Sequence, residues 1–121
     1  MKNWHEEAKA AKPWHEASEA MPLNEMCQEY ARYVSENYAM LSMLIENGLS
    51  EIIYTMFYGS LSSCQQSFVD IGDSDRRYAA CFVSAGLSQL TQKYIREHKK
   101  SNPAELARLA YKIMSGSIYH L

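Results

Sequence analysis

Apolar side chains recur every three to four residues along four stretches of the chain, the spacing of an α-helix that is buried on one side. The clearest stretch follows Asn102 and Pro103. Asn suits the N-cap, Pro suits the first helical position, and Glu105 completes a capping pattern. The sequence therefore predicts a helix over Pro103–Met114 that ends near Gly116. Its apolar stripe consists of Leu106, Leu109, Ala110, Ile113 and Met114.

Three longer stretches upstream are separated by glycines and predict three helices. The first two cover Asn24–Asn47 and Ser50–Ile71, and the third is capped by Ser74 or Asp73 and runs through Arg76 to about Lys99. Gly48 suits the left-handed residue that ends a helix, so we expect the first two helices to be antiparallel neighbours. The expected inward positions are Met26, Tyr30, Val34, Leu41, Leu44 and Ile45, then Ile53, Phe57, Leu61, Cys64 and Phe68, and finally Tyr78, Phe82, Ala85, Leu90 and Tyr94.

Gly86 lies inside the third of these helices, where Gly costs about 1 kcal/mol relative to Ala. A glycine at such a position indicates a place where another helix crosses closely.

The first residues form a separate segment, in which Trp4 and its neighbours recur ten residues later around Trp14. Pro13 would interrupt a continuous helix, so the segment is predicted as two short helical pieces. We divide the chain into an N-terminal amphipathic helical arm, residues 1–22, and a helical bundle domain, residues 23–121.

Composition agrees with this pattern, because the 121 residues include only three Pro and five Gly. The predicted fold is all-α: a single-domain antiparallel helical bundle of four main helices with an N-terminal helical arm. We expect a cytoplasmic protein that contacts no membrane, since a secretory signal and a membrane-spanning stretch are both missing from the pattern.

Charge is sorted by position along the chain. Residues 1–75 hold four Lys or Arg against twelve Asp or Glu, whereas residues 76–121 hold eight against two. The net charge of −2 therefore hides an acidic part and a basic part. Regions of opposite charge on one small protein favour self-association or binding of an oppositely charged partner.

Residues that could carry chemistry do not form a recognised motif. Cys27, Cys64 and Cys81 lack CxxC spacing and are interpreted as buried hydrophobes in a reducing compartment. The His and Glu side chains near Trp4 and Trp14 do not have the spacing of a metal-binding helix. We therefore predict a protein that is not an enzyme and that holds no metal and no cofactor.

Our main hypothesis is a macromolecule-binding protein, either a small subunit of an assembly or an inhibitor or immunity-type partner that acts by protein–protein interaction. Its contact or self-association surface would use aromatic side chains, because these dominate interface energetics. The predicted partner-binding residues are Trp4, Trp14, Tyr30 and Tyr33.

The alternative hypothesis is a nucleic-acid-associated small subunit that uses a basic surface on its last two helices. Lys and Arg side chains along one surface could follow a phosphate backbone. The residues predicted for this surface are Arg76, Arg77, Lys93, Arg96, Lys99 and Lys100.

Overall fold

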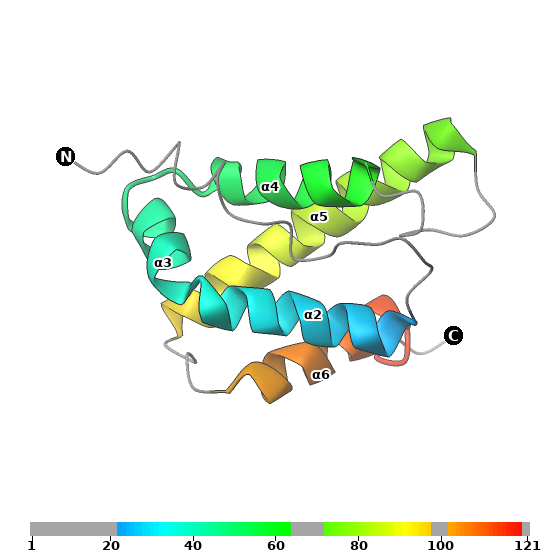
Figure 1. The fold of residues 1–121 in the computed structure, drawn as a ribbon. Coiled ribbons are helices and arrows are strands. Elements are labelled where there is room, and N and C mark those ends of the chain that lie inside the picture. Colours follow the sequence, from blue (N-terminus) through cyan, green and yellow to red (C-terminus); the bar gives the residue numbers. More distant parts are fainter. Residues whose placement is uncertain (1–21, 64–71, 98–101, 120–121) are drawn as a thin grey trace.

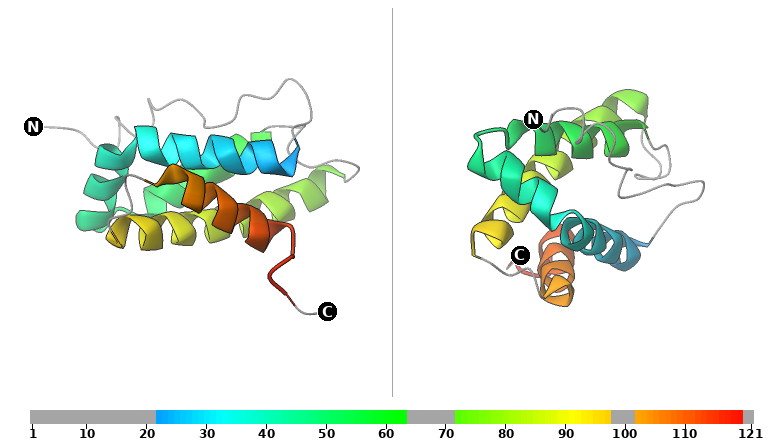
Figure 2. Two further views of the ribbon diagram at one scale, coloured as in Figure 1. Left: turned by 90° about the horizontal axis from the view of Figure 1, so that it is seen from below. Right: turned by 60° about the vertical axis from the view of Figure 1, so that its left-hand side comes forward.

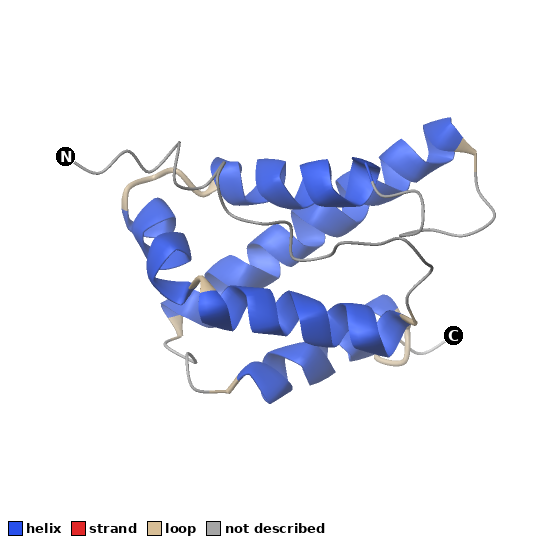
Figure 3. Ribbon diagram, in the orientation of Figure 1, coloured by secondary structure: helices blue, strands red, loops and turns tan. Residues whose placement is uncertain are grey.

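A computed structural model describes residues 22–63, 72–97 and 102–119 of the chain. This part contains helices and connecting turns, without a strand, so the predicted all-α fold is confirmed (Figures 1 and 3). The helices are α2 (Leu23–Glu36), α3 (Tyr38–Glu46), α4 (Glu51–Ser63), α5 (Asp73–Arg96) and α6 (Pro103–Met114). The predicted N-terminal arm lies outside the described residues.

Helix α6 begins and ends at the predicted residues. The side chain of Asn102 accepts a hydrogen bond from the backbone N–H of Glu105 over 3.2 Å, and Pro103 occupies the first helical position. The Glu105 carboxylate accepts a hydrogen bond from Arg108 Nε at 3.0 Å, and the two side chains form an exposed pair within the helix. Gly116 follows with a φ of 81° in the left-handed region.

The stretch predicted as a single helix over Asn24–Asn47 is two helices, because the helical backbone breaks at Asn37. The side-chain amide of Asn37 donates to the backbone oxygen of Tyr33 over 2.9 Å, a local bond that competes with regular helix. The predicted stop at Gly48 is confirmed, with a φ of 71°. Gly48 N–H bonds to the Ile45 oxygen at 3.2 Å and Leu49 N–H to the Leu44 oxygen at 2.8 Å, a Schellman turn.

The helices pack mainly as two pairs, α2 with α6 and α4 with α5. Within each pair the two helices run in opposite directions, and α5 crosses the molecule obliquely behind α4 (Figure 1). Seen from below, α6 lies between α2 and α5 (Figure 2, left). The short helix α3 joins the two pairs at one end.

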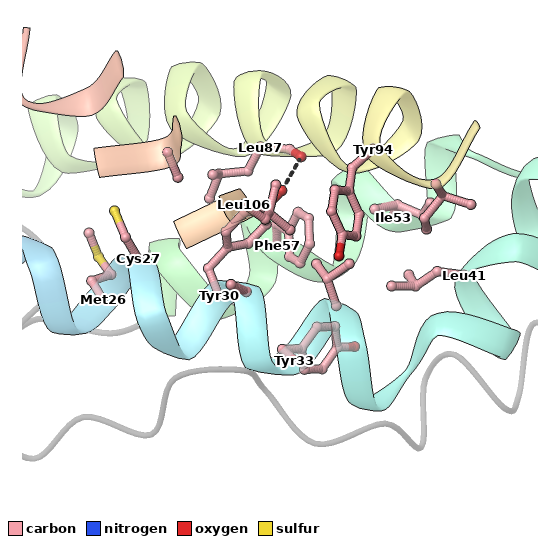
Figure 4. Packing of buried hydrophobic residues seen from close by; sticks show 14 of the residues in the cluster. Met26, Cys27, Tyr30, Tyr33, Leu41, Ile53, Phe57, Leu87, Tyr94 and Leu106 are labelled. Carbon is pink, nitrogen blue, oxygen red and sulfur yellow. Dashed lines mark hydrogen bonds between the residues drawn. The ribbon is translucent and has the colours of Figure 1, made fainter. Parts of the chain in front are cut away.

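Tyr30 lies at the centre of the core and connects three helices. Its side chain is 1% exposed, and its ring meets Phe57 of α4 edge-on, with centroids 5.9 Å apart (Figure 4). Its hydroxyl donates to the backbone oxygen of Leu87 over 3.3 Å and lies 2.8 Å from Thr91 Oγ1, both on α5. Thus a single side chain of α2 joins α4 to the inward side of α5.

The inward side of α5 differs from the predicted one. Of the predicted residues, Tyr94 is buried and Leu90 is half-buried, but Ala85 is exposed, Tyr78 is 77% exposed and Phe82 is 82% exposed. The residues that face the core are mostly small or polar: Ala80, Ser84, Leu87, Ser88, Thr91, Gln92, Tyr94 and Ile95. They prevail because they fit closely against α4 and supply the partners of the Tyr30 hydroxyl.

Removing the Tyr30 hydroxyl should weaken the fold measurably. We expect Tyr30→Phe to lower the free energy of unfolding by about 1 kcal/mol, since Thr91 and Leu87 lose a buried hydrogen-bond partner. Urea unfolding at a fixed protein concentration measures this change. The control is Tyr33→Phe, which removes a hydroxyl without a hydrogen bond inside the described part and should change stability by less than about 0.5 kcal/mol. Equal effects of the two variants would contradict the assigned role.

Candidate functional site: the hollow between helices α5 and α6

Large apolar side chains that remain exposed in the described part of the chain are concentrated on α5, on α6 and on the turn after α6. Phe82 and Tyr78 project from α5, where the chain itself leaves them largely uncovered. The full set is Tyr78, Phe82, Tyr111, Ile113, Ile118 and Tyr119. Single exposed apolar residues are ordinary, but a contiguous group of them marks a contact surface.

A hollow of about 670 Å³ opens between α5 and α6 beside these side chains. We call it the α5–α6 hollow. Gly116 turns the chain after α6, so that Tyr119 comes back to line the hollow. The lining is almost wholly apolar and consists of Phe82, Val83, Ala85, Gly86, Leu87, Gln89, Leu90, Ala110, Ile113, Met114, Gly116 and Tyr119. Such a surface can hold apolar groups but offers little for hydrogen bonding or acid–base chemistry.

Gly86 lines this hollow and faces away from the core. A Cβ atom added at Gly86 would meet no atom of the described chain within 4 Å. The close helix crossing predicted at this glycine is therefore not made within the described part. The outward side of α5 at Gly86 is open.

The predicted basic surface is divided between the two ends of α5. Arg76 forms an ion pair with Asp73 at 3.0 Å near the start of the helix, whereas Lys93 pairs with Glu97 at 2.8 Å near its end. From residue 77 to residue 93, α5 rises about 24 Å. Arg76 and Arg77 are thus separated from Lys93 and Arg96, while Lys99 and Lys100 lie outside the described residues.

The predicted partner-binding residues of helix α2 do not line the α5–α6 hollow. Tyr30 and Tyr33 are core residues, and burial raises the pKa of Tyr33 to about 12. A partner could reach these two rings only if the core opened. Trp4 and Trp14 lie outside the described residues.

A second, more polar hollow of about 450 Å³ lies between α4 and α5 and is lined by Tyr54, Tyr58, Ser74, Arg77, Tyr78 and Cys81. The rings of Tyr54 and Tyr58 are stacked with centroids 5.9 Å apart. Tyr54 donates its hydroxyl hydrogen to Cys81 Sγ over 3.4 Å, and this bond raises the pKa of Tyr54 above its ordinary value. No local sequence pattern indicates this contact, because residues 54 and 81 come together only through the packing of α4 on α5.

The cysteines divide by exposure. Cys27 is buried as predicted, but Cys81 is exposed, which corrects the expectation for that residue, and Cys64 lies outside the described residues. Across residues 22–63, 72–97 and 102–119, the structure brings together no group of three His, Cys, Asp or Glu side chains suited to a metal ion. Nor does any helix in these ranges have the length and apolar character needed to cross a membrane.

Most of the chain is similar to a known protein family. Residues 22–116 match the TetR family described as "Transcriptional regulator C-terminal region". The chain belongs to this family. No curated protein and no solved structure shows a significant match to the chain.

This TetR family membership contradicts the main hypothesis drawn from the sequence. The relatives of the chain are regulators of transcription, not small subunits or inhibitors that act by protein–protein interaction. The hypothesis was wrong because charge asymmetry and exposed aromatic residues indicate a contact surface without indicating what it serves. An association with nucleic acid, the alternative hypothesis, agrees better with the family.

The two described thiols of this TetR C-terminal region should differ in reactivity. Burial raises the pKa of Cys27 to about 11, so its thiolate is scarce at pH 8, and its side chain is only 2% exposed. We expect iodoacetamide at pH 8 to label Cys81 at least tenfold faster than Cys27, as measured by peptide mass spectrometry. In urea the two rates should converge. Equal rates in the folded protein would contradict the burial of Cys27.

Proposed function

We propose that the chain is the self-associating region of a transcriptional regulator and that two copies meet through the α5–α6 hollow and the aromatic side chains beside it. The family supports this proposal, because TetR domains typically dimerise. The observation that carries it is the exposure of Phe82 at the edge of an open apolar hollow, with Tyr78 exposed one turn earlier on α5.

Burial of these side chains supplies the driving force. Covering an exposed Phe side chain contributes about 1.5 to 3 kcal/mol. Phe82 is 82% exposed in the single chain, so nearly all of that contribution is available to an association. The neighbouring Ile113 and Tyr119 add further apolar area on the same hollow.

The surface is also suited to contact with itself. A two-fold dimer brings the same patch of both copies together, so each copy must offer both projecting and receiving features. Phe82 and Tyr78 project from α5, while the α5–α6 hollow can receive a projecting side chain of the other copy. Ala85 and Gly86 lie next to them on α5, and their small size allows the helix of a second copy to approach closely.

A symmetric pair would serve a regulator of transcription directly. Regulators that bind DNA as dimers read two half-sites related by a two-fold axis, and the dimer contact holds the two reading elements at a fixed spacing. In this proposal, the described region supplies that contact.

Replacing Phe82 with a charged residue should break the association. We expect Phe82→Glu to raise the dimer dissociation constant by roughly 30-fold or more, because a central aromatic residue of an interface is worth about 2 kcal/mol or more. Sedimentation velocity over a range of concentrations measures the constant.

The control for this experiment is Gln28→Glu, which places the same charge at an exposed position of α2 and should leave the constant unchanged. Circular dichroism should show an unaltered helix content for both variants, since Phe82 makes little contact with the core. An unmodified chain that stays monomeric at about 100 μM, a concentration well above that needed for a 1,600 Å² interface of typical affinity, would overturn the proposal.

The second candidate is direct binding of nucleic acid by the basic end of α5, where Lys93 and Arg96 are exposed. We expect Arg96→Glu combined with Lys99→Glu to weaken binding to duplex DNA of any sequence and to flatten its dependence on salt. Fluorescence anisotropy at about 50 and 200 mM salt measures both effects. Unchanged binding of the double variant would remove this surface from consideration.

A further inference from the structure

The outward stripe of α5 has charged ends and an apolar middle. Asp75, Tyr78, Phe82, Ala85 and Gln89 follow one another at steps of three and four residues, which places them on one side of the helix. Continuing the stripe past Gln89 leads to Lys93 and Arg96. The first turn of α5 contains Asp73 and Asp75, and its last turn contains Lys93 and Arg96.

These charges lie almost symmetrically about the middle of the helix. Asp75 precedes Ala85 by 10 residues and Arg96 follows it by 11, so each lies about 15 Å from Ala85 along the axis. Ala85 and Gly86 are thus the small residues at the centre of a stripe whose two ends carry opposite charge. A two-fold axis through this centre would superpose the acidic end of one copy on the basic end of the other.

We propose that the charges at the two ends of α5 select an antiparallel alignment of α5 with the α5 helix of a second copy of this chain. This inference rests on the proposed self-association and specifies its geometry. In the antiparallel alignment, Asp75 of each copy approaches Lys93 and Arg96 of the other. A parallel alignment would bring like charges together at both ends, which is unfavourable.

Neighbouring charges do not prevent this contact. Asp73 pairs with Arg76 away from the stripe, whereas Lys93 pairs with Glu97 of the same helix and keeps 74% of its side chain exposed. Exposed pairs of this kind hold their side chains only weakly. Arg76 itself is turned away from solvent, with 15% of its side chain exposed, so it contributes little to the outward stripe. The charges of the stripe therefore contribute mainly to alignment and choice of partner, while the apolar middle provides affinity.

Charge reversal tests the alignment. The acid variant carries Asp75→Lys, and the base variant carries Arg96→Glu. In an antiparallel dimer each variant alone places like charges at both contacts, so we expect its dissociation constant to rise by about tenfold or more at 50 mM salt. An equimolar mixture of the two should form a heterodimer, and one chain with both changes should dimerise as the unmodified chain does.

The control is Glu25→Lys, an equal change of charge at an exposed position of α2, which should leave the constant unaltered. Sedimentation velocity measures the dissociation constant of every variant. Acid and base variants that dimerise as well as the unmodified chain would overturn the alignment while leaving the proposed self-association standing. An unmodified chain that never dimerises would instead overturn the self-association itself.

Cross-linking provides a measurement that does not depend on affinity. In the antiparallel alignment, cysteines at position 85 of the two copies lie close to the axis, whereas cysteines at position 75 lie about 30 Å apart. Under mild oxidation Ala85→Cys should form a disulfide with itself and Asp75→Cys should not, with the linked peptides identified by mass spectrometry. Cross-linking of Asp75→Cys to itself would show a parallel alignment and overturn the inference.

Discussion

The packing of Tyr30 in the core, with its hydroxyl bonded to α5, is the constraint that joins α2, α4 and α5. Tyr30 is anchored on α2 and its ring lies against Phe57 of α4, so its hydroxyl reaches α5 from a fixed direction. An unbonded hydroxyl at this depth would be costly. Together with the burial of Tyr94 and Ile95, these bonds favour the rotation of α5 that turns Leu87 and Thr91 inward.

The candidate site follows from this rotation. Because the small and polar side of α5 packs on α4 and bonds to Tyr30 of α2, the side that carries Tyr78 and Phe82 is left facing outward. Helix α6 packs on α2 and lies beside α5, and the gap between their outward sides becomes the α5–α6 hollow. The same constraint that closes the core thus opens the surface on which the proposed function depends.

The sequence predicted the features that local chemistry decides. The Asn102 cap, the Pro103 start, the Gly48 turn and the all-α fold are each governed by a few neighbouring residues, and each is found in the structure. The inward side of α5 was predicted wrongly, because an apolar stripe shows that a surface is to be covered without showing whether the same chain covers it. The contact of Tyr54 with Cys81 was missed for a related reason, since it joins residues 27 positions apart. Membership of the regulator family was likewise beyond any local motif, since the similarity extends over residues 22–116.

The composition of α5 is difficult to explain by folding of a single chain alone. In the described part of the molecule, the buried polar side chains Ser84, Ser88, Thr91 and Gln92 all come from this helix, and Ser84 Oγ has no hydrogen-bond partner there. Burying polar groups is unfavourable unless they are paired, and exposing Phe82 forgoes the contribution of a large apolar side chain. A helix that had only to stabilise a monomer would carry the reverse arrangement. The two sides of α5 are consistent with two separate constraints, of which the inner one is the close fit around Tyr30 and the outer one is contact with a second surface.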